Sequence, residues 1–293
     1  MSNATQAVES GTSTSRIARR FAELAKHGEM GIVAYLTAGD PTLDATEIIV
    51  LAAAEAGADV IELGVPFSDP LADGPTIQRA SERALKSGTT LAGILALMGR
   101  LLRSTEVPIV LFSYFNPILQ MGLEKFATAA AEAGADGVLA TDLTPEEAGE
   151  YRAILHAHNL DTIFLAAPTS TDTRLAKIAV ATSGFLYLIS RTGVTGTRDA
   201  LPEDLPAFVR RVRQQTRLPI AVGFGISLPT HVTVLGGIAD AAVVGSAIVA
   251  EIEKAATPER AADAVANLIR NLKQAGKSGV SQRGIPAGSE NPS

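Results

Sequence analysis

Short apolar runs recur along the chain, and amphipathic segments separate them. Several of the runs are continuous instead of alternating, which is typical of parallel strands covered on both faces. Eight runs are predicted as strands: Gly31–Leu36, Asp59–Leu63, Pro108–Ser113, Gly137–Ala140, Thr162–Leu165, Gly184–Ile189, Pro219–Val222 and Ala241–Val244.

The segments between the runs are predicted as helices: Leu43–Ala56, Leu91–Leu102, Leu123–Glu132, Pro145–His156, Arg174–Thr182, Leu205–Gln214 and Pro229–Leu235. Eight such strand–helix units over about 250 residues predict an α/β fold of the (β/α)8 TIM-barrel type. A doubly wound open sheet is the alternative. It usually has fewer strands, and the chain has no G-x-G-x-x-G motif opening its first helix.

An internal echo supports this repeated organisation. Glu55-Ala56-Gly57-Ala58-Asp59-Val60 recurs as Glu132-Ala133-Gly134-Ala135-Asp136-Gly137, and more loosely at Gly236–Ala241. Each copy predicts a helix that ends at glycine, followed by a tight turn into a strand.

Composition narrows the class of protein. With 46% hydrophobic residues the chain has enough apolar side chains for a sizeable core, and without cysteine it has no disulfide or zinc–thiolate site. The net charge of −6 argues against a nucleic-acid partner. No transmembrane run or signal-peptide core is seen, so a cytoplasmic location is expected. We expect one domain over residues 16–275 with an extra N-terminal helix, and flexible tails at 1–15 and 276–293.

The second run carries a carboxylate among apolar residues. Alternation places Val60, Glu62 and Gly64 on one face, which suits the barrel interior near its mouth. An ionised carboxylate there is costly unless it is paired, so Glu62 indicates either acid–base chemistry or a buried structural pair. Asp69 and Asp73 follow in a loop rich in Gly and Pro, and plain turn chemistry is the preferred interpretation for Asp69.

Glycine-rich turns follow the seventh and eighth runs, at Gly223-Phe224-Gly225 and Gly245-Ser246. Barrel enzymes often bind phosphate at these two loops, with backbone N–H groups and a helix N-terminus as donors. The segment Ser190–Arg198 has the composition of a hinged, substrate-covering loop, although an ordinary loop is the alternative.

The remaining candidates give weaker signals. Tyr114 and Phe115 after the third run either line an apolar pocket or belong to the core. The four histidines fall in predicted helices or at their ends, where solvated faces are expected, and no metal-ligand cluster appears. The residues alone therefore indicate a barrel enzyme that acts on a phosphorylated small molecule, with no metal or organic cofactor.

The segment Glu62-Leu63-Gly64-Val65-Pro66-Phe67-Ser68-Asp69-Pro70-Leu71-Ala72-Asp73-Gly74-Pro75 resembles the signature of the tryptophan synthase alpha chain family. The resemblance continues at Ala34–Pro41, Tyr114–Pro117, Ser190–Gly196, Gly223–Ser227 and Val243–Ala247, and covers roughly residues 17–275.

The resemblance implies retro-aldol cleavage of indole-3-glycerol phosphate into indole and glyceraldehyde 3-phosphate, in tryptophan biosynthesis. Glu62 would be the general acid and base, and Asp73 would bind the indole N–H. Substrate-binding roles would fall to Tyr114, Tyr187, Thr195, Gly196, Phe224, Gly225, Gly245 and Ser246. The implied partner is the tryptophan synthase beta chain, a pyridoxal-phosphate enzyme, in an α2β2 complex whose barrel mouth faces beta. The alpha chain itself would carry no cofactor.

Two other functions remain open at this level. The chain is either a free-standing indole-glycerol-phosphate lyase that needs no beta chain, or a barrel kept as an allosteric partner without catalysis. The second alternative fits less well, because a binding role would not require both Glu62 and Asp73.

Overall fold

The computed structural model describes residues 15–189, 201–223 and 225–279. In this part of the chain one sheet has the strand order β5-β4-β3-β2-β1-β9-β8-β7-β6, with parallel neighbours. The strands are β1 (Gly31–Thr37), β2 (Val60–Gly64), β3 (Ile109–Ser113), β4 (Gly137–Ala140), β5 (Asp161–Ile163), β6 (Leu165–Ala166), β7 (Leu186–Ile189), β8 (Ile220–Gly223) and β9 (Ala241–Val244).

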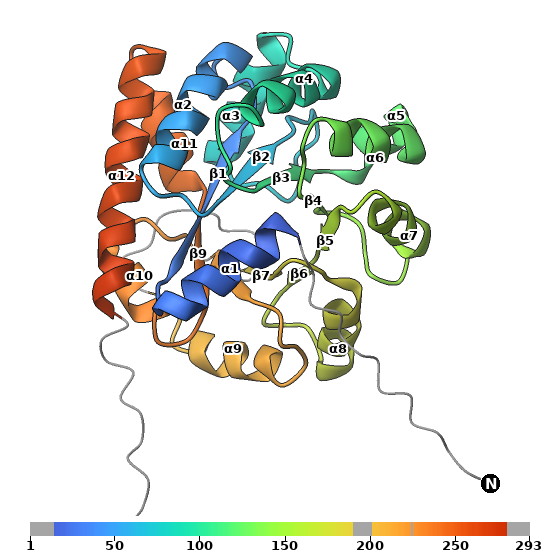
Figure 1. Cartoon of the computed structure of the whole chain (residues 1–293), viewed down its shortest axis with the longest axis vertical. Helices are drawn as coiled ribbons and strands as arrows, with labels where there is room; N and C mark the ends of the chain where they lie inside the picture. Colours follow the sequence, from blue (N-terminus) through green and yellow to red (C-terminus); the bar gives the residue numbers. More distant parts are fainter. Residues whose placement is uncertain (1–14, 190–200, 224, 280–293) are drawn as a thin grey trace, which may run out of the picture.

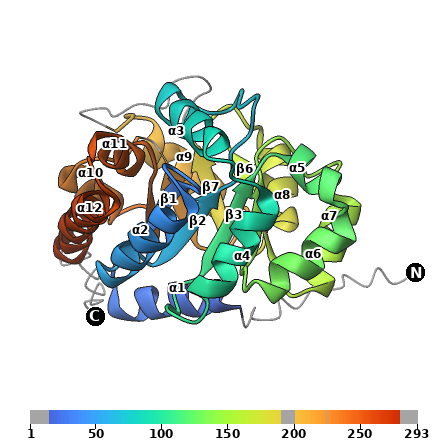
Figure 2. The same cartoon turned by 90° about the horizontal axis from the view of Figure 1, so that it is seen from above.

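The sheet forms a nearly closed barrel, because its end strands β5 and β6 follow one another with only Phe164 between them. The fifth predicted run therefore corresponds to two short strands, and all eight runs coincide with strands. Helices surround the strands in both views (Figures 1 and 2). The TIM-barrel prediction is confirmed, and the open sheet is excluded.

The helices of the described residues are α1 (Arg16–His27), α2 (Leu43–Glu55), α3 (Pro75–Lys86), α4 (Leu91–Leu101), α5 (Phe115–Met121), α6 (Leu123–Glu132), α7 (Gly149–Ala157), α8 (Asp172–Ala181), α9 (Leu205–Arg213), α10 (Pro229–Leu235), α11 (Ser246–Lys254) and α12 (Pro258–Gly279). No helix among them is long and apolar enough to cross a membrane.

The extra N-terminal helix covers one end of the barrel (Figure 1). Ile17, Phe21 and Leu24 of α1 are buried in the same cluster as Val33 and Val60, which point into the barrel. Because these apolar side chains fill the interior from the N-terminal ends of the strands, the opposite end remains for a site.

The helices differ from the predictions in several places. The helix predicted from Pro145 begins at Gly149, because residues 144–147 form a turn with a hydrogen bond from the Glu147 N–H to the Thr144 carbonyl. The helices α3, α5, α11 and α12 were not predicted. The helix α12 continues to Gly279, past the expected start of the tail at 276. A side chain at Gly276 would lie 3.0 Å from the Met30 Cβ, so this glycine allows α12 to pack closely.

The internal echo has a structural role at the base of the barrel. At four places a residue that comes shortly before one strand (β2, β4, β7 or β9) accepts a hydrogen bond from the backbone N–H near the start of an earlier strand (β1, β3, β5 or β8). Aspartates do this in the three copies of the echo, and Ser183 does it beside β5. The pairs are Ile32–Asp59 at 2.6 Å, Ile109–Asp136 at 2.7 Å, Thr162–Ser183 at 2.9 Å and Ile220–Asp240 at 2.8 Å.

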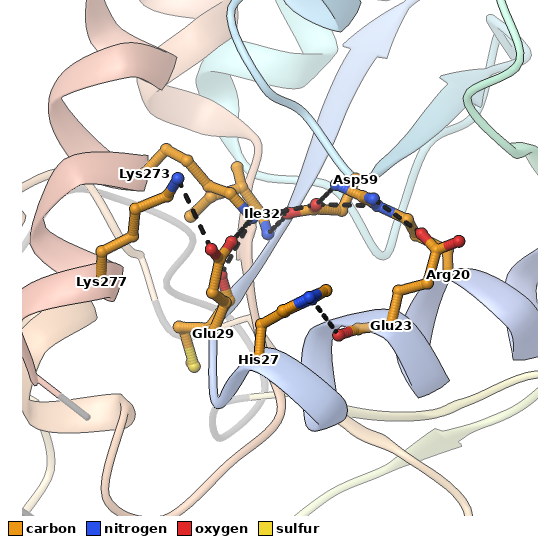
Figure 3. Close-up of polar contacts among 9 residues, drawn as sticks. Arg20, Glu23, His27, Glu29, Ile32, Asp59, Lys273 and Lys277 are labelled. Atoms are coloured by element: carbon orange, nitrogen blue, oxygen red, sulfur yellow. Dashed lines mark hydrogen bonds and ion pairs between the residues drawn. The ribbon is translucent and has the colours of Figure 1, made fainter. Parts of the chain in front are cut away.

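Cations pair with these aspartates, most extensively at the buried Asp59 (Figure 3). Lys273 of α12 reaches the Asp59 carboxylate at 2.7 Å, and Arg20 of α1 binds the other side. Lys273 also donates to the Met30 carbonyl at 3.3 Å. The first and last described helices are therefore joined through one buried carboxylate. We call the contacts of Asp59 with Arg20, Ile32 and Lys273 the basal clasp.

Candidate active site at the barrel mouth

The strand β2 places Glu62 inside the barrel. Its neighbours Ile61 and Leu63 belong to the core between sheet and helices, whereas Val60 belongs to the interior cluster. Glu62 therefore points inward, as the alternation predicts, and lies beside Tyr35 in the register of β1 and β2.

The Glu62 carboxyl group is fully buried, with 0% exposure. Neither of its oxygens has a hydrogen-bond partner within the described residues. Burial therefore raises the pKa of Glu62 to about 8. The group retains its proton at neutral pH, which is the state that a general acid requires.

Asp73 ends the loop that links β2 to α3 and is only partly buried. Burial raises the pKa of Asp73 to about 6, while a hydrogen bond from the Tyr114 hydroxyl opposes the rise. That hydroxyl lies 3.3 Å from Asp73 Oδ2. The two carboxyl groups thus have separated pKa values, with Asp73 mostly ionised and Glu62 mostly neutral at pH 7.

Two side chains hold the Asp73 loop from different elements. The Tyr114 hydroxyl accepts the Ala72 N–H at 2.9 Å, and the Tyr114 ring stacks on Phe67 of the same loop. The Gln78 amide of α3 donates to the Asp73 carbonyl at 2.8 Å. The position of Asp73 therefore depends on both Tyr114 and Gln78.

A cavity of about 450 Å³ opens at the barrel mouth, and we call it the mouth cavity. Asp73, Tyr35 and Phe112 contribute to its wall, whereas Glu62 is not among its lining residues. The other lining residues are Leu71, Ala72, Gly74, Pro75, Ile77, Gln78, Thr141, Leu165, Tyr187, Ile189, Gly223, Gly225, Ile226, Val243, Gly245 and Ser246.

Glycines let two tyrosine rings lie against the strand ends. A Cβ at Gly64 would collide with the Tyr35 hydroxyl, and one at Gly223 would lie 2.7 Å from the Tyr187 hydroxyl. Burial raises the pKa of both phenols, and the nearby Glu62 adds to the effect. The rings therefore stay neutral and form an apolar wall close to Glu62.

The predicted site residues are distributed as follows. Tyr187, Gly225, Gly245 and Ser246 line the mouth cavity together with Asp73. Tyr114 is not among the described lining residues and instead contacts the Asp73 loop. The remaining three predicted site residues lie outside the described residues: Thr195, Gly196 and Phe224. The whole segment Ser190–Arg198 lies outside them as well.

Sequence reasoning missed Tyr35 and Gln78 as parts of the site. Tyr35 shares the inward face of β1 with Val33, so alternation alone signals its direction, but only the register places it beside Glu62. Gln78 gives no such signal, because its contact with Asp73 depends on the path of the loop.

One histidine prediction was wrong. His231 was expected on a solvated helix face, but it is only 3% exposed, because α10 packs against both α12 and β9. Asp69 is exposed in the β2–α3 loop, in agreement with a turn residue. No cluster of three or more metal-ligating side chains occurs in the described residues.

Comparison with known proteins agrees with the site. The family model described as tryptophan synthase alpha chain matches residues 21–277. The tryptophan synthase alpha chain of Solibacter usitatus is 51% identical over 259 residues, which cover 88% of this chain and 97% of the relative. The chain belongs to the tryptophan synthase alpha chain family.

Solved structures give the same result for the fold. A Mycobacterium tuberculosis tryptophan synthase structure matches with a TM-score of 0.84 and 35% identity, covering 90% of this chain and 98% of that one. The alpha subunit from Legionella pneumophila matches with a TM-score of 0.82 and 36% identity, covering 89% and 98%.

Membership defines the reaction of this chain. It is the alpha subunit of tryptophan synthase, a carbon–carbon lyase that cleaves indole-3-glycerol phosphate into indole and glyceraldehyde 3-phosphate. It functions with a beta-chain partner, and the pyridoxal phosphate of the synthase belongs to that partner.

Proposed function

We propose that Glu62 and Asp73 divide the lyase reaction between them in the mouth cavity. Glu62 protonates the C3 carbon of the indole ring and takes the proton from the glycerol hydroxyl next to it. The carbon–carbon bond then breaks to give indole and an aldehyde, with no net change in protons. Asp73 binds the indole N–H and stabilises the positive charge that develops on the protonated ring.

The observation that carries this proposal is the contrast between the two carboxyl groups. The neutral, fully buried Glu62 lies beside Tyr35, which lines the mouth cavity, and the partly buried Asp73 lines that cavity directly. An acid that must give up a proton to carbon and a carboxylate that must face a cation need these different environments.

The phosphate group binds at the other strand ends, across β1 from Asp73. Gly225 follows β8, and Gly245 is the N-cap of α11, whose first residue is Ser246. Backbone N–H groups at a helix N-terminus, without bulky side chains in front of them, favour an anion. The family resemblance assigns Gly196 and Thr195 to substrate binding as well, and assigns Phe224 to the ring and glycerol. Tyr187 lines the cavity on the ring side, and Tyr114 acts through its contact with Asp73.

The test is indole release by single variants of the full chain. E62Q and D73N are each expected to lower kcat/KM at least about 100-fold, as loss of an acid–base group does. D69N is the matched control, because Asp69 lies in the same loop and is exposed. Near-normal indole production by E62Q would show that another group supplies the proton.

The proposed assembly is an α2β2 tetramer whose beta chains face the barrel mouths. Purified beta chain is expected to raise indole turnover by this chain, and sedimentation of the mixture should give the mass of two chains of each kind. Unchanged turnover would instead support a free-standing lyase. A wild-type chain that binds beta but releases no indole would support an allosteric partner without catalysis.

We expect the protein to work in the cytoplasm, as a single domain over residues 16–279, with the α12 boundary taken from the structure. Cell fractionation tests the first expectation, and limited proteolysis with mass spectrometry tests the second.

A further inference from the structure

A buried histidine lies next to the segment assigned to phosphate binding. His231 is the third residue of α10, the helix that follows β8, and it is 3% exposed. Its Nδ1 atom lies 3.3 Å from the backbone N of Ser227. The reaction as proposed above gives this imidazole no role.

The contact defines the state of the imidazole ring. A backbone N–H can only donate, so Nδ1 must be the unprotonated acceptor, and the single proton of the neutral ring lies on Nε2. Nε2 is buried without a hydrogen-bond partner in the described residues. A protein that tolerates this costly unpaired donor has a reason to keep an acceptor at Nδ1.

The Nδ1 atom of His231 accepts a hydrogen bond from the last residue of the short turn Gly225–Ser227. Gly225 and Ile226, which come directly before Ser227, line the mouth cavity, and Gly225 has a left-handed φ of 72°. The turn therefore has no regular strand or helix to define its shape. His231 ties its last N–H to α10, and α10 is packed against α12 and β9.

We propose that His231 is a positioning residue that shapes the Gly225–Ser227 turn for the phosphate group of the substrate. It acts through the Ser227 N–H and does not touch the reacting atoms. The inference rests on the proposed phosphate role of this turn. Its consequence is selective: loss of the Nδ1 acceptor weakens binding of the phosphate end and leaves the indole end and the chemical step unchanged.

The experiment compares H231N and H231L in the full chain. The Asn Oδ1 atom falls close to the place of Nδ1 and can accept the same N–H, whereas Leu fills the space without an acceptor. Glycerol 3-phosphate is the probe for the phosphate end and indole is the probe for the ring end, both titrated calorimetrically. Indole-release kinetics provide KM and kcat separately.

We expect H231L to weaken glycerol 3-phosphate binding about tenfold and to raise KM by a similar factor, with kcat within about twofold. Indole affinity stays at the wild-type value, and H231N behaves as wild type in every measurement. Equal glycerol 3-phosphate affinities in H231L and wild type overturn the inference, as does an equal loss of indole affinity. So does a loss in H231N that matches H231L.

Three further outcomes are separable. If H231L does not fold, H231Q replaces it, because the longer amide reaches the Nε2 position instead of Nδ1; the inference then requires weak binding in H231Q and normal binding in H231N. If the wild-type chain itself does not bind glycerol 3-phosphate, the phosphate assignment of the cavity fails. If wild type binds and the variants do not differ, only the role of His231 fails.

Discussion

A single buried carboxyl group, Glu62, couples catalysis to stability. Its pKa in the folded chain, about 8, is above the ordinary value of 4.5, so the folded state holds the proton more tightly than the unfolded state. The contribution of Glu62 to the free energy of unfolding is fully present below about pH 4.5 and is lost as the pH rises toward 8. The same neutral acid that suits proton transfer therefore makes the fold less stable in alkali.

E62Q is expected to remove this dependence, because the amide never ionises. The variant should equal wild type in free energy of unfolding near pH 5 and exceed it at pH 9 by roughly 1–4 kcal/mol. Urea unfolding at both pH values measures the difference. E55Q, at the exposed end of α2, should keep the wild-type profile. A wild type that is as stable as E62Q at pH 9 would contradict the buried, unpaired state of Glu62.

The pH profile of kcat/KM should be bell-shaped for the isolated chain, with limbs near the two carboxyl pKa values, about 6 and about 8. Activity needs ionised Asp73 and protonated Glu62. Y114F removes the hydrogen bond that favours the Asp73 carboxylate, so its acidic limb should move to higher pH. Y151F, which changes a buried tyrosine of α7, serves as the control. An acidic limb at the same pH in Y114F and wild type would show that Tyr114 does not affect the pKa of Asp73.

At the scale of elements, strands were easier to predict than helices. Parallel strands covered on both faces carry short continuous apolar runs, and the regular recurrence of these runs between amphipathic segments located all eight positions. The helices α3, α5 and α11 begin directly after loops of the site, where Gly and Pro conceal the start of the helical spacing. His231 was misplaced for a related reason: α10 has only seven residues and is covered on more than one side.

The basal clasp makes a prediction about one element, α12. K273M removes a buried cation from Asp59 and should lower the free energy of unfolding by about 2–4 kcal/mol, because the carboxylate stays buried with Arg20 alone. K277M is the matched control one turn later, where the lysine is 59% exposed and pairs with Glu29 at the surface. Chemical denaturation measures both. Equal effects of the two substitutions would mean that burial of Lys273 adds nothing.

At the scale of the whole molecule, the family signature identified the reaction, and the barrel rules located the site at the C-terminal ends of the strands. The arrangement inside the site depends on register and loop path. Tyr35 beside Glu62 and Gln78 under Asp73 follow from neither composition nor spacing, because both contacts join segments whose relative position only the folded barrel defines.

The rim of the mouth leads to a prediction for the assembly. Leu71, which lines the mouth cavity, is 94% exposed, which is unusual for a leucine and suits a surface that a partner covers. L71S should weaken beta-chain binding about tenfold, measured as the beta concentration at half-maximal stimulation so that any change in turnover of the isolated chain is separated from it. V180S changes an exposed valine of α8, on the outside of the barrel, and is the control. Titration of beta chain against indole release distinguishes them, and equal beta affinities in L71S and V180S would exclude Leu71 from the interface.

The basal clasp also sets an order of events during synthesis on the ribosome. Asp59 is made early, but its buried lysine partner follows 214 residues later in the chain. Until α12 leaves the exit tunnel, Arg20 is the one cation of the Asp59 carboxylate, among its partners in the described residues, that has already been made. The contact between Lys273 and Asp59 therefore forms only when translation is nearly finished. A nascent chain that stops before Lys273 lacks this contact at the base of the barrel.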